Sequence, residues 1–223
     1  PLPETKLKSG TVLVVGLGNR GVTPESLGPR VAERVFVTRH IKEHMPEAFD
    51  FDIPSVCAIA PGVLGVTGVE TMDIVFGVAN KVKPDLIIAV DALASRRAAR
   101  ISTTIQLSDS GISPGSGVGN TRADLSRANL GVPVIAVGVP LVVYASTISQ
   151  DTISLIADET GLHGDEARLR ELAEQVIAKH MGDFIVTPKD IDVIVEDMAG
   201  IIANAINSAL FGNNLEQVRN MLA

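Results

Sequence analysis

Uninterrupted runs of aliphatic residues alternate along much of the chain with segments whose apolar residues recur at helical spacing. The runs predict buried strands at Thr11–Gly18, Val56–Ala60, Pro84–Asp91 and Pro133–Val139. A more alternating run at Ile101–Leu107 predicts a further strand, at a sheet edge. Because continuous aliphatic strands are typical of parallel sheets that are covered on both faces, we expect helices on both sides of one sheet.

Helices are expected between these strands and over most of the last third of the chain. Thr23-Pro24-Glu25 has the form of a helix start and predicts a helix that runs towards His44. The other predicted helices are Thr67–Val82, Val142–Ile156, Glu166–His180 and Asp190–Leu210.

Alternating strands and helices predict an α/β fold: a doubly wound, mostly parallel sheet in a three-layer domain with a C-terminal helical segment. We expect residues 1–223 to form a single domain, in which residues 1–160 build the sheet core and residues 161–223 the helical segment. In such sheets, ligands bind outside the carboxyl ends of the strands.

The composition narrows the classes of function. The formal net charge of -7 argues against direct nucleic-acid binding, which needs a basic face. A single cysteine, Cys57, excludes an intrachain disulfide, and we found no apolar stretch of the length that a membrane span requires. We therefore expect neither nucleic acid nor membrane as a partner, and a cytoplasmic location.

Two acidic residues follow predicted strands and are candidates for acid–base chemistry. Glu25 comes shortly after the first strand, and Asp91 closes the run PDLIIAVD. An acid at the end of an apolar strand has its pKa raised by burial, and a second carboxylate nearby raises it further. The alternatives are that Glu25 merely complements a helix dipole and that Asp91 caps a turn.

A glycine-rich loop, Ser108–Asn120, offers backbone N–H groups that could bind a substrate strand or an oxyanion. It lacks the lysine of a phosphate-binding loop, so it is a weak signal for nucleotide binding. The four histidines are scattered, and only two carboxylates are expected to converge, so we predict no metal and no cofactor. The candidate substrate-binding residues are Asn19, Asp109, Gly115, Gly117, Gly119 and Asn120.

Six blocks of sequence together resemble the germination proteases of spore-forming bacteria, which are in turn similar in fold to hydrogenase-maturation endopeptidases. The blocks are LVVGLGNRGVTPESLGP, IAPGVLGVTGVETMDIV, KPDLIIAVDALASR, TIQLSDSGISPGSGVGN, LGVPVIAVGVP and VTPKDIDVIVEDMA. The resemblance implies an atypical acid endopeptidase that cleaves small acid-soluble spore proteins during germination in the spore core. It also implies a homo-oligomer, a tetramer in the family.

The family's two essential aspartates correspond, by the motifs TPxxLGP and DALAxR, to Glu25 and Asp91. The chain therefore carries Glu where the family usually has Asp, as hydrogenase-maturation enzymes do. Family members have a longer N-terminal region with a pro-segment that silences the zymogen, and a longer insertion before VTPK. We therefore expect this chain to be a fragment or a zymogen-derived core, inactive in that state. The alternatives are a metal-reading maturation-like endopeptidase and a non-catalytic phosphate- or nucleotide-binding module.

Overall fold

The computed structural model describes residues 9–48, 52–115, 123–161, 164–180 and 184–222. Within them, one sheet has the strand order β2-β1-β3-β5-β4, and β6 also pairs with β5. The four strands β2, β1, β3 and β5 are parallel, whereas β4 and β6 run antiparallel to β5. The strands are β1 (Thr11–Gly16), β2 (Ser55–Ile59), β3 (Leu86–Ser95), β4 (Gln106–Ser108), β5 (Val134–Tyr144) and β6 (Ile185–Val186).

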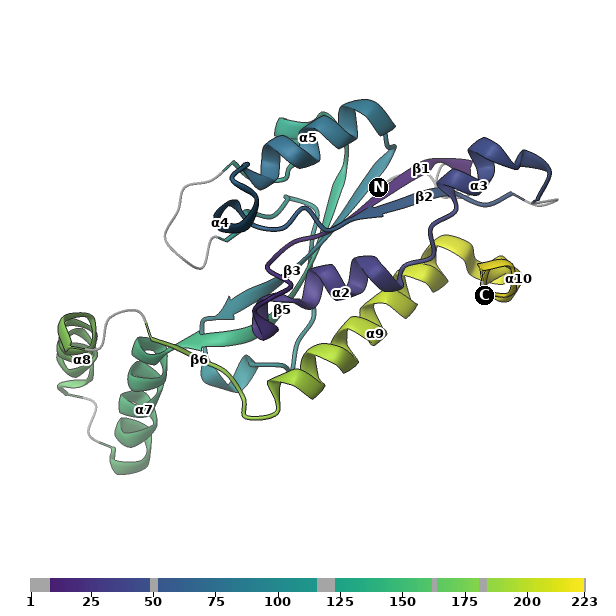
Figure 1. The fold of residues 1–223 in the computed structure, drawn as a ribbon. Coiled ribbons are helices and arrows are strands. Elements are labelled where there is room, and N and C mark those ends of the chain that lie inside the picture. The colour runs from purple at the N-terminus through teal and green to yellow at the C-terminus, as the bar shows by residue number, and fades with distance from the viewer. Residues whose placement is uncertain (1–8, 49–51, 116–122, 162–163, 181–183, 223) are drawn as a thin grey trace.

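Helices lie on both faces of this sheet, which confirms the predicted doubly wound α/β architecture (Figure 1). The longer helices are α2 (Leu27–Arg34), α5 (Thr71–Val82), α7 (Ala145–Thr160), α8 (Glu166–His180), α9 (Ile191–Phe211) and α10 (Leu215–Leu222). The shorter ones are η1 (Thr23–Glu25), α3 (Arg39–His44), η2 (Pro46–Ala48), α4 (Leu64–Thr67), η3 (Ala98–Arg100), α6 (Arg127–Leu130) and η5 (Gly212–Asn214).

Side chains of one strand alternate between two separate hydrophobic cores. In β1, Val12 and Val14 face a core that α2 and α9 cover, whereas Leu13 and Val15 face a core that α5 covers. Full burial of one such side chain stabilises the fold by about 1.5–3 kcal/mol. This two-sided burial explains why the strand reads as an unbroken aliphatic run.

The predicted helix from Thr23 towards His44 is wrong, because the chain breaks it into η1, α2 and α3. The backbone leaves the helix at Val35, and tertiary contacts then satisfy the freed N–H groups. Phe36 donates its N–H to Oδ1 of Asn207 at 2.9 Å, and Thr38 donates its N–H to the carbonyl of Val56 at 2.9 Å. Neither partner is visible in the local sequence.

Two strands are longer than predicted. β3 continues four residues beyond Asp91 to Ser95, and β5 continues to Tyr144, because these extensions pair with each other past a register shift at Leu93 and Ala94. The helix predicted to begin at Val142 accordingly begins at Ala145. At the sheet edge, β4 spans Gln106–Ser108 and so shares only Gln106 and Leu107 with the expected strand Ile101–Leu107.

Helix α9 carries the wide apolar stripe expected of a docked helix. By length and composition alone, the stretch Ile191–Leu222 could cross a membrane, as the core helix of many proteins could. Its residues Val195, Ala199, Ile202 and Ile206 are buried in the same core as the even-numbered residues of β1. We therefore assign α9 as a core helix.

Candidate active site

Asp91 lies in β3 just beyond the point where the neighbouring strand β1 ends. The last pair between β1 and β3 joins Gly16 to Val90, so Asp91 is the first residue of β3 beyond β1. Its side chain follows Ile87 and Ala89, which face the core covered by α5, and only 8% of the residue is exposed. On its other side Asp91 pairs with Gly138 of β5, which has no side chain to cover it.

The turn that carries Glu25 is held close to this point by two glycines. A β-carbon added to Gly28 would stand 2.2 Å from the carbonyl oxygen of Leu17 and 2.5 Å from that of Val90. A β-carbon on Gly16 would stand 2.1 Å from the carbonyl oxygen of Gly28. Because real side chains do not tolerate such distances, only glycine lets the start of α2 lie against the ends of β1 and β3.

Gly18 packs against the backbone of Glu25 and lies near the side chain of Asp91. A β-carbon there would stand 2.1 Å from the carbonyl oxygen of Glu25 and 3.8 Å from Oδ1 of Asp91. Its φ of 114° is a conformation that favours glycine. The backbone of Glu25 and the side chain of Asp91, 66 positions apart in sequence, thus both lie near one residue of the β1–η1 loop.

Burial raises the pKa of Asp91 from an ordinary value of 3.8 to about 7. The backbone N–H of Ala92, which donates to Oδ1 at 2.8 Å, lowers this pKa and so limits the shift. The negative charge of Glu25 raises the pKa further, which places Glu25 within electrostatic reach of Asp91. A carboxyl group with such a pKa is largely protonated just below neutrality and can donate a proton.

The two acids differ in their surroundings. Asp91 is buried, whereas Glu25 is exposed. In the described part of the chain, the Glu25 side chain makes no hydrogen bond to the protein. Because it is exposed, its carboxylate can bind water. A buried carboxyl and an exposed carboxylate within electrostatic reach of each other are suited to acid and base roles on one substrate.

The candidate substrate-binding residues are only partly gathered at this place. Asn19 lies in the β1–η1 loop beside Gly18, but its Oδ1 already accepts the N–H of Gly21 at 2.9 Å, so it supports the loop. Gly115 is exposed, with a φ of 68°. Gly117, Gly119 and Asn120 lie outside the described residues.

Asp109 is carried away from Asp91 by the direction of β4. Gln106 is level with Gly138, the partner of Asp91, whereas Ser108 is level with Ala136. Each further residue of β4 therefore moves towards the amino ends of the parallel strands. Asp109 is exposed and directly follows Ser108, which is level with Ala136 and not with Gly138, the partner of Asp91.

Within the described residues, no group of three His, Cys, Asp or Glu side chains could hold a metal ion. Cys57 is half-buried, and burial raises the pKa of its thiol above the ordinary value of 9.0. Its Sγ lies 3.7 Å from the carbonyl oxygen of Val12, within the sheet. The neutral thiol is therefore part of the packing.

Residues that build the site through backbone contacts were not identified from the sequence. Gly18 and Gly28 belong to the motifs GLGN and LGP, but their role depends on contacts between β1, β3 and α2. Ser26 was also missed, although it is completely buried beside Glu25. A small polar residue directly after a candidate acid is the one local signal that could have indicated it.

Comparisons with known proteins agree with one another. A family model described as germination protease matches residues 4–168 and 160–221. The germination protease of Clostridium acetobutylicum is 48% identical over 223 residues, covering 94% of this chain and 68% of the relative. That of Bacillus cytotoxicus is 42% identical over 247 residues, covering 91% and 67%.

Among solved structures, the NiFe hydrogenase maturation protease HycI from Thermococcus kodakarensis is similar, with a TM-score of 0.44 and 18% identity. The match covers 90% of this chain and 96% of that one. The family match and the identities above, each spanning most of the chain, show that this protein belongs to the germination protease family of peptidases.

Proposed function

We propose that the protein hydrolyses peptide bonds of small acid-soluble spore proteins with Glu25 and Asp91 as a carboxylate pair. Two observations carry this proposal. A β-carbon added to Gly18 would stand 2.1 Å from the backbone carbonyl oxygen of Glu25 and 3.8 Å from Oδ1 of Asp91, and the pKa of Asp91 is raised to about 7. Membership of the germination protease family supports the reaction class, and the family resemblance supports the substrate.

In the proposed reaction, Glu25 is the general base and Asp91 the general acid. The Glu25 carboxylate takes one proton from water, and the resulting hydroxide attacks the carbonyl carbon of the scissile peptide bond. The Asp91 carboxyl gives its proton to the carbonyl oxygen as the tetrahedral intermediate forms. Glu25 then delivers its proton to the leaving nitrogen, the C–N bond breaks, and Asp91 regains a proton as the carbonyl re-forms. One water is consumed, and both acids return to their starting states.

The roles follow from the surroundings of the two side chains. The buried carboxyl is the one that burial keeps neutral, so it is suited to donate. The exposed carboxylate has access to water and is suited to accept. Strongly coupled acids titrate as a pair, so the apparent pKa values of a rate profile belong to the two together.

The proposal is tested by incubating the activated full-length protein with a small acid-soluble spore protein and identifying the products by mass spectrometry. We expect internal cleavage by the wild type and by Asp73→Asn, an exposed acid of α5 that serves as the control. We expect cleavage by Asp91→Asn to be slower by a factor of about 10²–10⁴. Cleavage by Asp91→Asn at the wild-type rate would reject the proposed role.

We further propose that the protein acts as a homo-oligomer in the spore core, as the family resemblance implies. Exposed apolar side chains on α7 and α8 support self-association, because exposed apolar surface is often covered by a partner protein. They are Leu155, Ile156, Leu169, Leu172 and Val176. Light scattering after size exclusion would measure the mass, and a monomer at micromolar concentration would contradict this assembly.

A further inference from the structure

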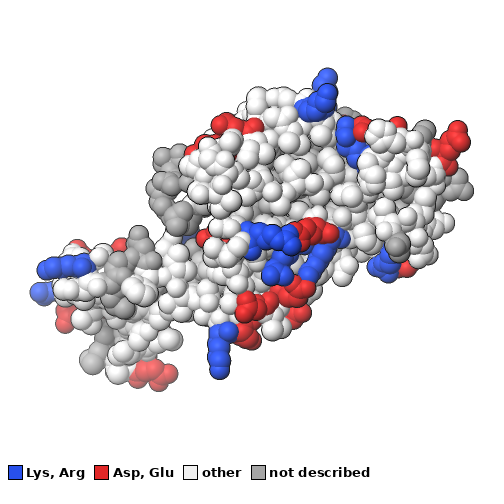
Figure 2. Space-filling view, viewed as in Figure 1, with Lys and Arg blue, Asp and Glu red and all other residues white. Residues whose placement is uncertain are grey.

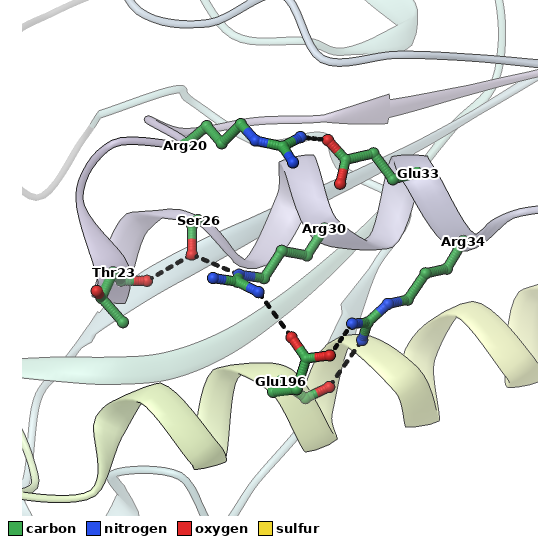
Figure 3. A network of polar contacts seen from close by, with 7 residues as sticks. All are labelled: Arg20, Thr23, Ser26, Arg30, Glu33, Arg34 and Glu196. Atoms are coloured by element: carbon green, nitrogen blue, oxygen red, sulfur yellow. Dashed lines mark hydrogen bonds and ion pairs between the residues drawn. The ribbon is translucent and has the colours of Figure 1, made fainter.

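A chain of polar contacts connects helix α9 to the turn that carries Glu25 (Figure 3). Arg30 of α2 donates from Nη1 to Oε2 of Glu196 on α9 at 2.6 Å. The same guanidinium donates from Nε to Oγ of Ser26 at 3.1 Å. Ser26 in turn donates from Oγ to the carbonyl oxygen of Thr23 at 2.8 Å. Thr23 and Ser26 bracket Glu25 in the sequence.

Ser26 is buried and links Arg30 to Thr23 in this series of hydrogen bonds. It is 0% exposed, and its hydroxyl group is used twice, as acceptor from Arg30 and as donor to Thr23. Its backbone N–H also donates to the carbonyl of Thr23, at 3.0 Å. Arg30 is therefore linked through one hydroxyl group to both Ser26 and Thr23, the two ends of the turn.

The opposite side of the turn is held by the β1–η1 loop. The N–H of Glu25 donates to the carbonyl of Val22 at 2.9 Å, and the carbonyl of Glu25 lies against Gly18. The Glu25 side chain itself has no hydrogen-bond partner among the described residues. Its position relative to Asp91 is thus set by the backbone of the turn.

We infer that Arg30, held by Glu196, is a positioning residue that fixes the turn of Glu25 through the hydroxyl of Ser26. This inference rests on the proposed catalytic role of Glu25. It gives α9 a part in the reaction that its packing alone would not require. Charged side chains of both signs gather over α2 and α9 on the face shown in Figure 2, as such a connection needs.

Arg34 provides a matched control in the same cluster. It binds the same carboxylate of Glu196 and donates from Nη1 to the carbonyl oxygen of that residue at 2.9 Å. Its hydrogen bond to Glu196 is the main cause that lowers the pKa of that carboxyl. Unlike Arg30, Arg34 makes no hydrogen bond to the turn of Glu25 in the described structure. Both arginines therefore dock α9, but only Arg30 reaches Ser26.

The test compares Arg30→Gln, Ser26→Ala and Arg34→Gln in the activated full-length protein, with steady-state cleavage and thermal unfolding measured for each. We expect Arg30→Gln and Ser26→Ala each to lower kcat about 10- to 100-fold, with KM within about twofold of wild type, because small displacements of a catalytic group are costly. We expect Arg34→Gln to lower the melting temperature as much as Arg30→Gln does, but to keep kcat within about twofold.

Two other results separate the possible failures. Equal losses of kcat in Arg30→Gln and Arg34→Gln, or no loss in either, would overturn the inference and leave the cluster as a helix-docking contact. Glu25→Gln is measured alongside them. Full activity in Glu25→Gln would overturn the proposed catalytic pair itself, and the positioning role with it.

Discussion

Gly18 lies directly against the carbonyl oxygen of Glu25, where a β-carbon would stand 2.1 Å away. The contact fixes the turn of one candidate catalytic acid over the loop that leads from β1. The same added carbon would stand 3.8 Å from Oδ1 of the other acid, Asp91. A side chain at this position would therefore clash with the backbone of Glu25 and come into ordinary van der Waals contact with Asp91.

Gly18→Ala is expected to displace the turn and lower kcat at least tenfold, since the clash is with backbone and cannot be relieved by a rotamer change. The free energy of unfolding should fall by more than about 2 kcal/mol, from the clash and from the positive φ together. Gly131→Ala is the control, because Gly131 has a φ of 69° with no atom within 4 Å of an added β-carbon. That variant should cost only about 1–2 kcal/mol and leave kcat unchanged. Equal effects of the two substitutions would show that the contact with Glu25 is unimportant.

The rate of cleavage is expected to depend on the ionisation of Asp91. Because its pKa is raised to about 7 and the proposed role needs the protonated form, kcat/KM should fall above pH 7, by about tenfold per pH unit. A carboxyl carbon titration by NMR should assign an apparent pKa near 7 to Asp91. In Glu25→Gln that value should decrease, because the charge of Glu25 raises it. A titration of Asp91 near pH 4 would contradict the acid role.

The raised pKa of Asp91 also predicts how the free energy of unfolding depends on pH. An acid whose pKa is raised on folding binds its proton more tightly in the native state. The contribution of Asp91 to the free energy of unfolding is therefore largest at low pH, where the group is protonated. This contribution decreases as the pH rises from about 4 to about 7, and the free energy of unfolding no longer changes with the ionisation of Asp91 above that range. Asp91→Asn should therefore be more stable than wild type at pH 8, by an amount on the order of 4 kcal/mol at most, and should match it below pH 4. Denaturant unfolding at the two pH values measures this, and a variant less stable at pH 8 would contradict it.

Glu25→Asp is expected to retain or increase cleavage, since it introduces the acid that the motif resemblance implies for the family at this position. Glu25→Gln should abolish cleavage, because the amide keeps the shape but cannot accept a proton from water. Both variants should fold, as an exposed acid in a first turn contributes only about 0.3–1 kcal/mol. Steady-state assays and circular dichroism distinguish these effects. Should Glu25→Gln cleave at the wild-type rate, the base must be another residue; the sequence offers Asp109, although the structure carries it away from Asp91.

The sequence predicted those parts of the fold that depend on local patterns. The aliphatic runs of β1, β3 and β5 identified the sheet, because both of its faces are buried. Two predictions about the fold were wrong for the same reason. The helix break after Arg34 depends on Asn207, and the extension of β3 beyond Asp91 depends on its pairing with β5. Such long-range contacts leave no local signal.

The site followed the same rule. Glu25 and Asp91 could be proposed as candidates because each follows an apolar strand or its loop, and because their motifs resemble a known family. The glycine contacts that hold the turn of Glu25 against the ends of β1 and β3 and the Ser26–Arg30–Glu196 connection join segments far apart in the chain. They became visible only in the folded structure.

The central claim is that Glu25 and Asp91 act together on one peptide bond, and a double-mutant cycle measures this most directly. The value of kcat/KM for a small acid-soluble spore protein is compared among wild type, Glu25→Gln, Asp91→Asn and the double variant. When two residues act as one unit, the first substitution removes most of the rate enhancement that they provide together, and the second adds little. We predict that each single variant loses about 10²–10⁴ in rate and that the double variant is no more than about tenfold slower than the slower single one. Losses that simply multiply in the double variant, or wild-type activity in either single variant, would contradict the account.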